Sequence, residues 1–159
     1  MSKECSWLGS LGVPDCCVTV KTAATENGRR FQLLAPTGVS VLRVRVDGCW
    51  LSGTDRRKVD YLFTAEVANG KRLCVLVELK GKEYGKALSQ VEDTIKYIES
   101  IPAYLKERPN TLVAHVVLSQ GNQIPRYQVQ EEKLRKKYGL RIYRTSQRGE
   151  YRIPPHLAL

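Results

Sequence analysis

The sequence VLVELKG at residues 75–81 is an apolar run, typical of a strand, that carries two charges close to its end. Side chains alternate between the faces of a strand, so Glu78 and Lys80 are expected on one face and Val77 and Leu79 on the other. A charged pair at the end of a buried strand costs free energy unless it has a partner or a chemical role. We therefore predict a functional site at Glu78 and Lys80, with an ordinary ion pair as the alternative.

A second apolar run, residues 59–63, carries Asp60. Asn69-Gly70 lies between the two runs and is typical of a tight hairpin turn. The hairpin would make the runs antiparallel neighbours and would bring Asp60 beside Glu78. Two carboxylates and a lysine would then converge on one metal ion and one phosphate.

The remaining elements follow from changes in hydrophobic period. Residues 39–46 alternate and are β-branched, as in a strand. Leucine, valine and isoleucine recur on one face of a helix over 84–99, which Pro102 would end. The apolar run 111–118 is typical of a central strand.

The C-terminal third predicts a helix over 127–138, stopped by Gly139, and a short strand over 140–144. The order of elements indicates an α/β fold with a mixed sheet. Its first three strands would form a meander, and the first helix would cross over to a parallel strand.

The first 36 residues are ambiguous in sequence. Residues 18–20 favour an extended chain, residues 22–26 a short helix, and residues 26–28 a turn.

The composition fits one soluble domain of 159 residues with a formal net charge of +10. This charge favours a polyanionic partner, although solubility alone is the simpler interpretation. No apolar run reaches the length of a membrane span, so no membrane partner is expected. The first residues lack the apolar core of a signal peptide, which makes the cytoplasm the default location. Five cysteines, an odd number, then argue against a disulfide framework.

The acidic pair suits a hard divalent cation, and Mg²⁺ prefers oxygen ligands. We expect Asp60 and Glu78 to bind Mg²⁺, with Mn²⁺ as a substitute, and the Leu79 carbonyl to add a third ligand. Lys80 would orient or deprotonate the attacking water, or stabilise negative charge in the transition state.

These residues resemble the PD-(D/E)xK superfamily of restriction-endonuclease-like nucleases, especially its small bacterial and mobile-element members. The resemblance covers about residues 39–118 and rests on residues 46–49, residues 58–63, residues 78–81 and residues 87–90. Val59 stands where the proline of the superfamily name would be. The resemblance implies an αβββαβ core and a single nuclease-like domain over 1–159.

The resemblance also implies further site residues. Gln90 would lie near the scissile phosphate, unless it is an ordinary solvent-facing residue. Glu26 would be a third acid; Asp47 is a second candidate, although a turn-forming role before Gly48 is the simpler interpretation.

The predicted activity is metal-dependent endonucleolytic hydrolysis of DNA, and cutting both strands at once would require a homodimer. Cations that flank the site would hold the nucleic acid: Arg56, Arg57, Lys58, Lys82 and Lys86. A basic C-terminal third with interleaved tyrosines could add a surface for the phosphate backbone, or be only a solvated face. The alternatives are an inactive nuclease-like module that binds nucleic acid or protein, and, less favoured by the charge, an inhibitor protein.

Overall fold

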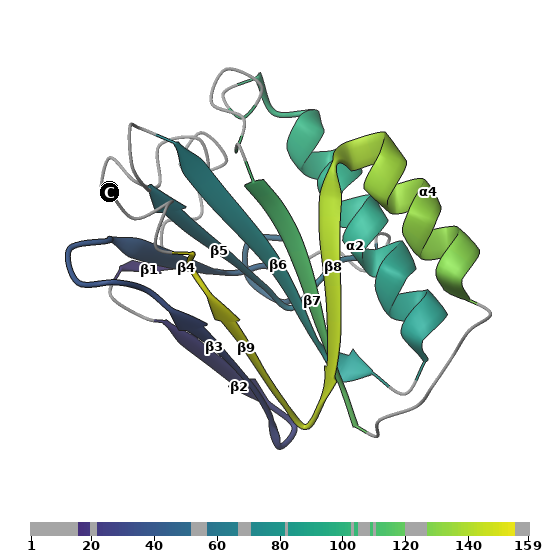
Figure 1. Ribbon diagram of the computed structural model, residues 1–159, viewed down its shortest axis with the longest axis horizontal. Coiled ribbons are helices and arrows are strands. Elements are labelled where there is room, and N and C mark those ends of the chain that lie inside the picture. Colours follow the sequence, from purple (N-terminus) through teal and green to yellow (C-terminus); the bar gives the residue numbers. More distant parts are fainter. Residues whose placement is uncertain are drawn as a thin grey trace.

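In the part of the chain that the structure describes, helices cover one face of a six-stranded sheet and a three-stranded sheet covers the other, which gives three layers (Figure 1). This computed structural model describes residues 16–19, 22–51, 57–66, 71–81, 83–102, 104, 109, 111–119 and 127–154. Within these residues, the α/β class predicted from the sequence is confirmed.

The six-stranded sheet has a mixed strand order that agrees with the prediction. Strands β4, β5 and β6 form an antiparallel meander, and β7 and β8 extend it in parallel. The short strand β1 pairs with the outer edge of β4. The strands, in spatial order, are β1 (Cys17–Thr19), β4 (Val41–Arg45), β5 (Tyr61–Glu66), β6 (Arg72–Gly81), β7 (Thr111–Leu118) and β8 (Leu140–Ser146).

The two helices, α2 (Tyr84–Glu99) and α4 (Gln128–Tyr138), lie between parallel strands in the chain and pack on the same face of the sheet (Figure 1). Helix α2 ends before Pro102, and Gly139 ends α4 with a left-handed φ of 66°, as predicted. No helix within the described residues is long and apolar enough to cross a membrane.

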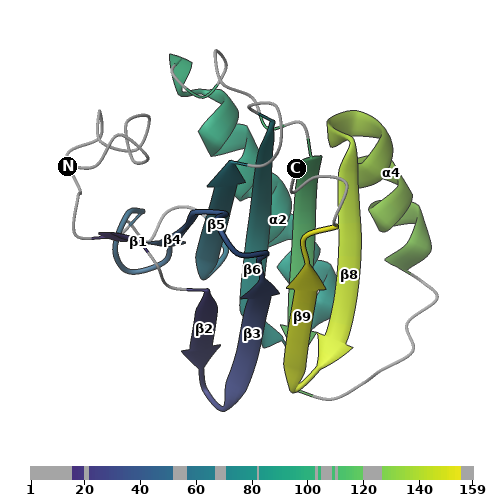
Figure 2. The ribbon, with the colours of Figure 1, turned by 60° about the vertical axis from the view of Figure 1, so that its left-hand side comes forward.

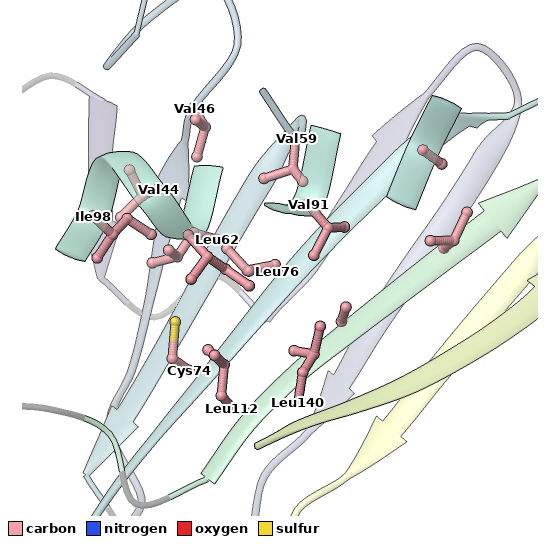
Figure 3. Close-up of a cluster of buried hydrophobic side chains, with 14 of the residues drawn as sticks. Val44, Val46, Val59, Leu62, Cys74, Leu76, Val91, Ile98, Leu112 and Leu140 are labelled. Carbon is pink, nitrogen blue, oxygen red and sulfur yellow. The ribbon is translucent and has the colours of Figure 1, made fainter. Parts of the chain in front are cut away.

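The core on the helix side joins the two helices to the sheet. Val91 and Ile98 of α2 lie over Leu62 and Leu76 of the central strands (Figure 3). Cys74 is a buried free thiol in this core, as the sequence predicts.

The second sheet is absent from the sequence predictions. It consists of β2 (Ala23–Glu26), β3 (Arg29–Leu34) and β9 (Arg148–Arg152), with β3 antiparallel to β2 and parallel to β9. The helix predicted over 22–26 is therefore wrong, whereas the turn is confirmed. Asn27 and Gly28 both have positive φ, 51° and 76°, which matches the twist that a two-residue hairpin needs.

A second core fills the space between the two sheets. Phe31 and Leu33 of β3 face Phe63 and Val75 of the large sheet, and all four are at most 1% exposed. In Figure 2 the small sheet lies in front of the large one, and its strands run in nearly the same direction. This core holds the N-terminal hairpin and the C-terminal strand β9 against the main sheet.

His115 of β7 is buried against this second core, with 2% of its surface exposed. Its ring lies 5.1 Å from the ring of Phe31 and 6.0 Å from that of Tyr143, and its Nε2 is 3.1 Å from the Thr145 hydroxyl. A Cβ at Gly149 would come within 2.5 Å of Nε2. Burial lowers the pKa of His115 to about 4.

We expect the free energy of unfolding to fall as the pH drops from about 6.5, the ordinary histidine pKa, towards 4. The unfolded chain binds a proton on His115 in this window and the folded chain does not. The contribution is complete above the unfolded pKa and amounts to roughly 3 kcal/mol. Urea unfolding at pH 7 and pH 4 should show a larger loss for the wild type than for His115→Gln. Equal losses would contradict the burial of this histidine.

Cys16 and Cys49 form a disulfide that joins the start of β1 to the turn after β4, and Cys17 is disulfide-bonded as well. The expectation of a chain without disulfides is therefore wrong. The bond spans 33 residues and fixes the edge of the six-stranded sheet. An odd cysteine number does not exclude disulfides when one thiol, that of Cys74, is buried in the core.

Replacing Cys49 with serine should lower the free energy of unfolding by about 3–4 kcal/mol, since a loop of this length restricts the unfolded chain. The difference from the wild type should disappear when both proteins are unfolded in excess reducing agent. Urea unfolding with and without dithiothreitol measures this, with Cys74→Ser as a control whose effect reductant leaves unchanged. A reductant-independent loss in Cys49→Ser would contradict the disulfide.

Candidate active site

The candidate site lies at the end of the large sheet where the parallel strands β6 and β7 finish. The β8–β9 turn reaches this end, because the Gln147 amide donates to the Leu118 carbonyl over 2.9 Å. The β2–β3 hairpin reaches it too, since the Arg30 amide donates to the Gln147 carbonyl over 3.1 Å. Both turns lie in the lower part of Figure 1. Ligands of α/β sheets commonly bind at the carboxyl ends of the strands.

Asp60 and Glu78 lie beside each other at this end. Tyr61 of β5 pairs with Val77 of β6, so the register places Asp60 opposite Glu78. Asp60 is 2% exposed and Glu78 is fully buried. Two buried carboxylates at adjacent positions repel each other, and a cation between them would stabilise both.

Leu79 lies between Glu78 and Lys80. Strand β5 begins at Tyr61, which pairs with Val77, so Leu79 lies beyond the paired part of β5. Its amide donates to Asp60 Oδ2 over 2.8 Å. Its carbonyl accepts from Nη1 of Arg29, on the second sheet, over 2.8 Å. The two charged side chains thus replace the missing backbone partners of Leu79. Arg29 occupies the oxygen that the sequence predicts as the third metal ligand.

The pairing of β6 with β7 shifts by one residue between Glu78 and Gly81. Bulges of this kind re-aim side chains, and they are frequent beside active sites. The shift interrupts the strict alternation from which Glu78 and Lys80 are predicted to share a face. The Lys80 side chain lies outside the described part of the chain.

Helix α2 holds the segment that leads into Asp60. The Gln90 side-chain amide donates to the Lys58 carbonyl over 3.1 Å. One turn further, the Thr94 hydroxyl accepts from the Val59 amide over 3.0 Å. Gln90 is predicted beside the scissile phosphate, but its side-chain amide binds the backbone of Lys58. Gln90 and Thr94 together position the segment that leads into Asp60.

Lys58 is 7% exposed, and its Nζ lies 4.0 Å from Asp47 Oδ1. The cation predicted to face nucleic acid at Lys58 is therefore buried beside Asp47. Asp47 precedes Gly48, which has a φ of 78°, and the Leu51 amide donates to the Val46 carbonyl across this turn. Asp47 therefore lies at the start of a turn, where the simpler interpretation expects it.

Glu26, the other candidate for a third acid, ends strand β2 rather than a helix. It is the cross-strand partner of Arg29 in the hairpin. Opposite charges at paired positions stabilise a hairpin modestly. Glu26 is thus paired with the residue whose guanidinium contacts the Leu79 carbonyl.

Of the cations predicted to hold nucleic acid, Arg57 and Lys86 are exposed. Arg56 and Lys82 lie outside the described residues. On α4, Arg135, Lys136 and Lys137 form ion pairs with Glu131, Glu132 and Glu92 at 3.4–3.9 Å. This part of the basic C-terminal third is therefore at least partly neutralised on the protein itself.

The carboxylates of Asp60 and Glu78 offer oxygen ligands for a divalent cation at this end of the sheet. No group of three or more His, Cys, Asp or Glu in the described ranges could hold a metal ion. Mg²⁺ is commonly held by one or two carboxylates, and it keeps several waters and substrate oxygens. Asp60 and Glu78 fit that pattern.

Sequence reasoning missed Arg29 and Thr94. The position of Arg29 on a strand could have been predicted, because Asn27-Gly28 is typical of a two-residue hairpin and Arg29 follows it directly. No sequence pattern predicts the role of Thr94, since only the packing of α2 brings it to Val59.

No family model, curated protein or solved structure matches this chain in the comparisons made.

Proposed function

We propose that this protein is a Mg²⁺-dependent endonuclease that hydrolyses phosphodiester bonds in DNA, on a restriction-endonuclease-like fold. The observation that carries the proposal is the pair of buried carboxylates, Asp60 and Glu78, at the ends of neighbouring strands. The meander followed by helix α2 and a parallel strand supports the fold assignment.

In this proposal Asp60 and Glu78 hold the metal, and Lys80 acts on the attacking water. The bound metal would supply charge neutralisation at the phosphate and would lower the pKa of a water ligand. Gln90 and Thr94 fix the segment before Asp60, so the carboxylate is held in place before substrate binds.

Exposed cations near the site support a nucleic-acid partner. Lys86 lies in the first turn of α2, close in sequence to the end of β6. Arg30 and Arg148 are both exposed and are direct partners on β3 and β9. Paired like charges destabilise a sheet unless an anion neutralises them, and a phosphate backbone would do so without reading sequence.

A second function is favoured by one observation, the occupation of the Leu79 carbonyl by Arg29. With that oxygen engaged, the chain could be a nuclease-like module that binds nucleic acid without cleaving it.

Calorimetric titration with MnCl₂ tests the proposal. We expect binding at one site in the wild type and a loss of at least about tenfold in affinity in Asp60→Asn. The asparagine keeps an oxygen that can accept the Leu79 amide, so the fold should persist. Asp93→Asn, on α2 and outside the site, is the matched control. A wild type that binds DNA, binds no Mn²⁺ and cuts nothing would establish the module instead.

A further inference from the structure

Arg29 is the one residue of the second sheet with a described hydrogen bond to the backbone of the residue between Glu78 and Lys80. It follows the Asn27-Gly28 turn, and its cross-strand partner is Glu26. Phe31, two positions further along the same face, is fully buried between the sheets. The hairpin therefore directs Arg29 towards the large sheet and anchors it there.

The guanidinium lies where a bound cation would need the Leu79 oxygen. Its Nη1 is 2.8 Å from that oxygen, and Asp60 Oδ2 is 2.8 Å from the amide of the same residue. A positive charge bound to the backbone between the two predicted ligands would repel a dication there, and it also engages a lone pair of the Leu79 carbonyl.

We infer that Arg29 is a positioning residue that weakens divalent-cation binding at the Asp60–Glu78 pair by holding the Leu79 carbonyl. The inference rests on the proposed function only in placing the cation between these two carboxylates. It means that the chain holds its cation through two side chains, with the remaining positions left to water and to substrate oxygens. Free enzyme would then bind metal weakly, and binding would strengthen when phosphate oxygens join.

The test is the affinity for Mn²⁺ alone, measured by calorimetry without nucleic acid. Arg29→Met keeps most of the side-chain length and removes the charge, so we expect Mn²⁺ to bind about tenfold more tightly or better. Arg29→Lys keeps the charge and should stay closer to the wild type. Arg30→Met removes an equal charge one residue away on the outer face of the hairpin, and it should change the affinity much less.

Equal or weaker Mn²⁺ binding by Arg29→Met would overturn the inference, and so would an equal gain in Arg30→Met. Circular dichroism and thermal melting show whether each variant is folded. If Arg29→Met does not fold, Arg29→Lys takes its place in the test. An affinity of Arg29→Lys for Mn²⁺ above that of Arg30→Met would then refute the inference. The proposed function fails separately. A wild type that cuts no DNA, beside an Arg29→Met variant that gains Mn²⁺ binding, would refute native catalysis and leave the role of Arg29 intact.

Discussion

Glu78→Gln is expected to reduce phosphodiester cleavage by about a thousandfold or more. Glu78 is fully buried beside Asp60, and in the proposed site it supplies half of the protein's charge on the metal. A metal ion contributes several kcal/mol of transition-state stabilisation, and about 4 kcal/mol corresponds to three orders of magnitude in rate. Glutamine has nearly the same shape, so the loss should appear in kcat rather than in folding.

Plasmid cleavage under single-turnover conditions measures this effect. Glu132→Gln is the control, because Glu132 is exposed on α4 and forms an ion pair with Lys136. Its rate should remain within about twofold of the wild type. Cleavage by Glu78→Gln at the rate of this control would remove Glu78 from the mechanism.

Phe31→Ala is expected to lower the free energy of unfolding by about 3–5 kcal/mol. The ring is fully buried between the two sheets, and its centroid lies 5.4 Å from that of Phe63 and 5.1 Å from that of His115. Its removal would leave a cavity where the hairpin joins the main sheet. Because Arg29 is two residues away on the same strand, the hairpin should also lose its hold on the end of β6.

Equilibrium unfolding in urea measures the loss. Val129→Ala, at a position that is 67% exposed on α4, is the control and should stay within about 0.5 kcal/mol of the wild type. A loss below about 1 kcal/mol in Phe31→Ala would mean that the second sheet does not pack on the first as described.

The large sheet could be predicted from sequence because its elements are long and strongly patterned. The apolar runs at β6 and β7 and the buried face of α2 leave few alternatives, and the right-handed crossover rule orders them. The second sheet could not be predicted from the sequence, since β3 pairs with β9, which lies near the opposite end of the chain. Strand β2, with two alanines, also has a composition that does not distinguish strand from helix.

The Asp60–Glu78 pair could be predicted from the sequence, because one hairpin sets the register of both residues. The remaining contacts of the site depend on tertiary packing that no local pattern reports. Arg29 reaches Leu79 from another sheet, and Gln90 binds the Lys58 backbone because α2 crosses that segment. The sequence predicts a surface cation at Lys58, whereas folding buries this residue beside Asp47.

Cleavage of DNA by the wild-type protein is the direct test of a metal-dependent nuclease site at Asp60 and Glu78. Plasmid, single-stranded and branched DNA would each be incubated with Mg²⁺ or Mn²⁺, and in parallel with excess EDTA. The proposed site predicts hydrolysis of at least one of these substrates with either metal and none with EDTA. No cleavage of any substrate, or equal cleavage in EDTA, would contradict a metal-dependent nuclease built on Asp60 and Glu78.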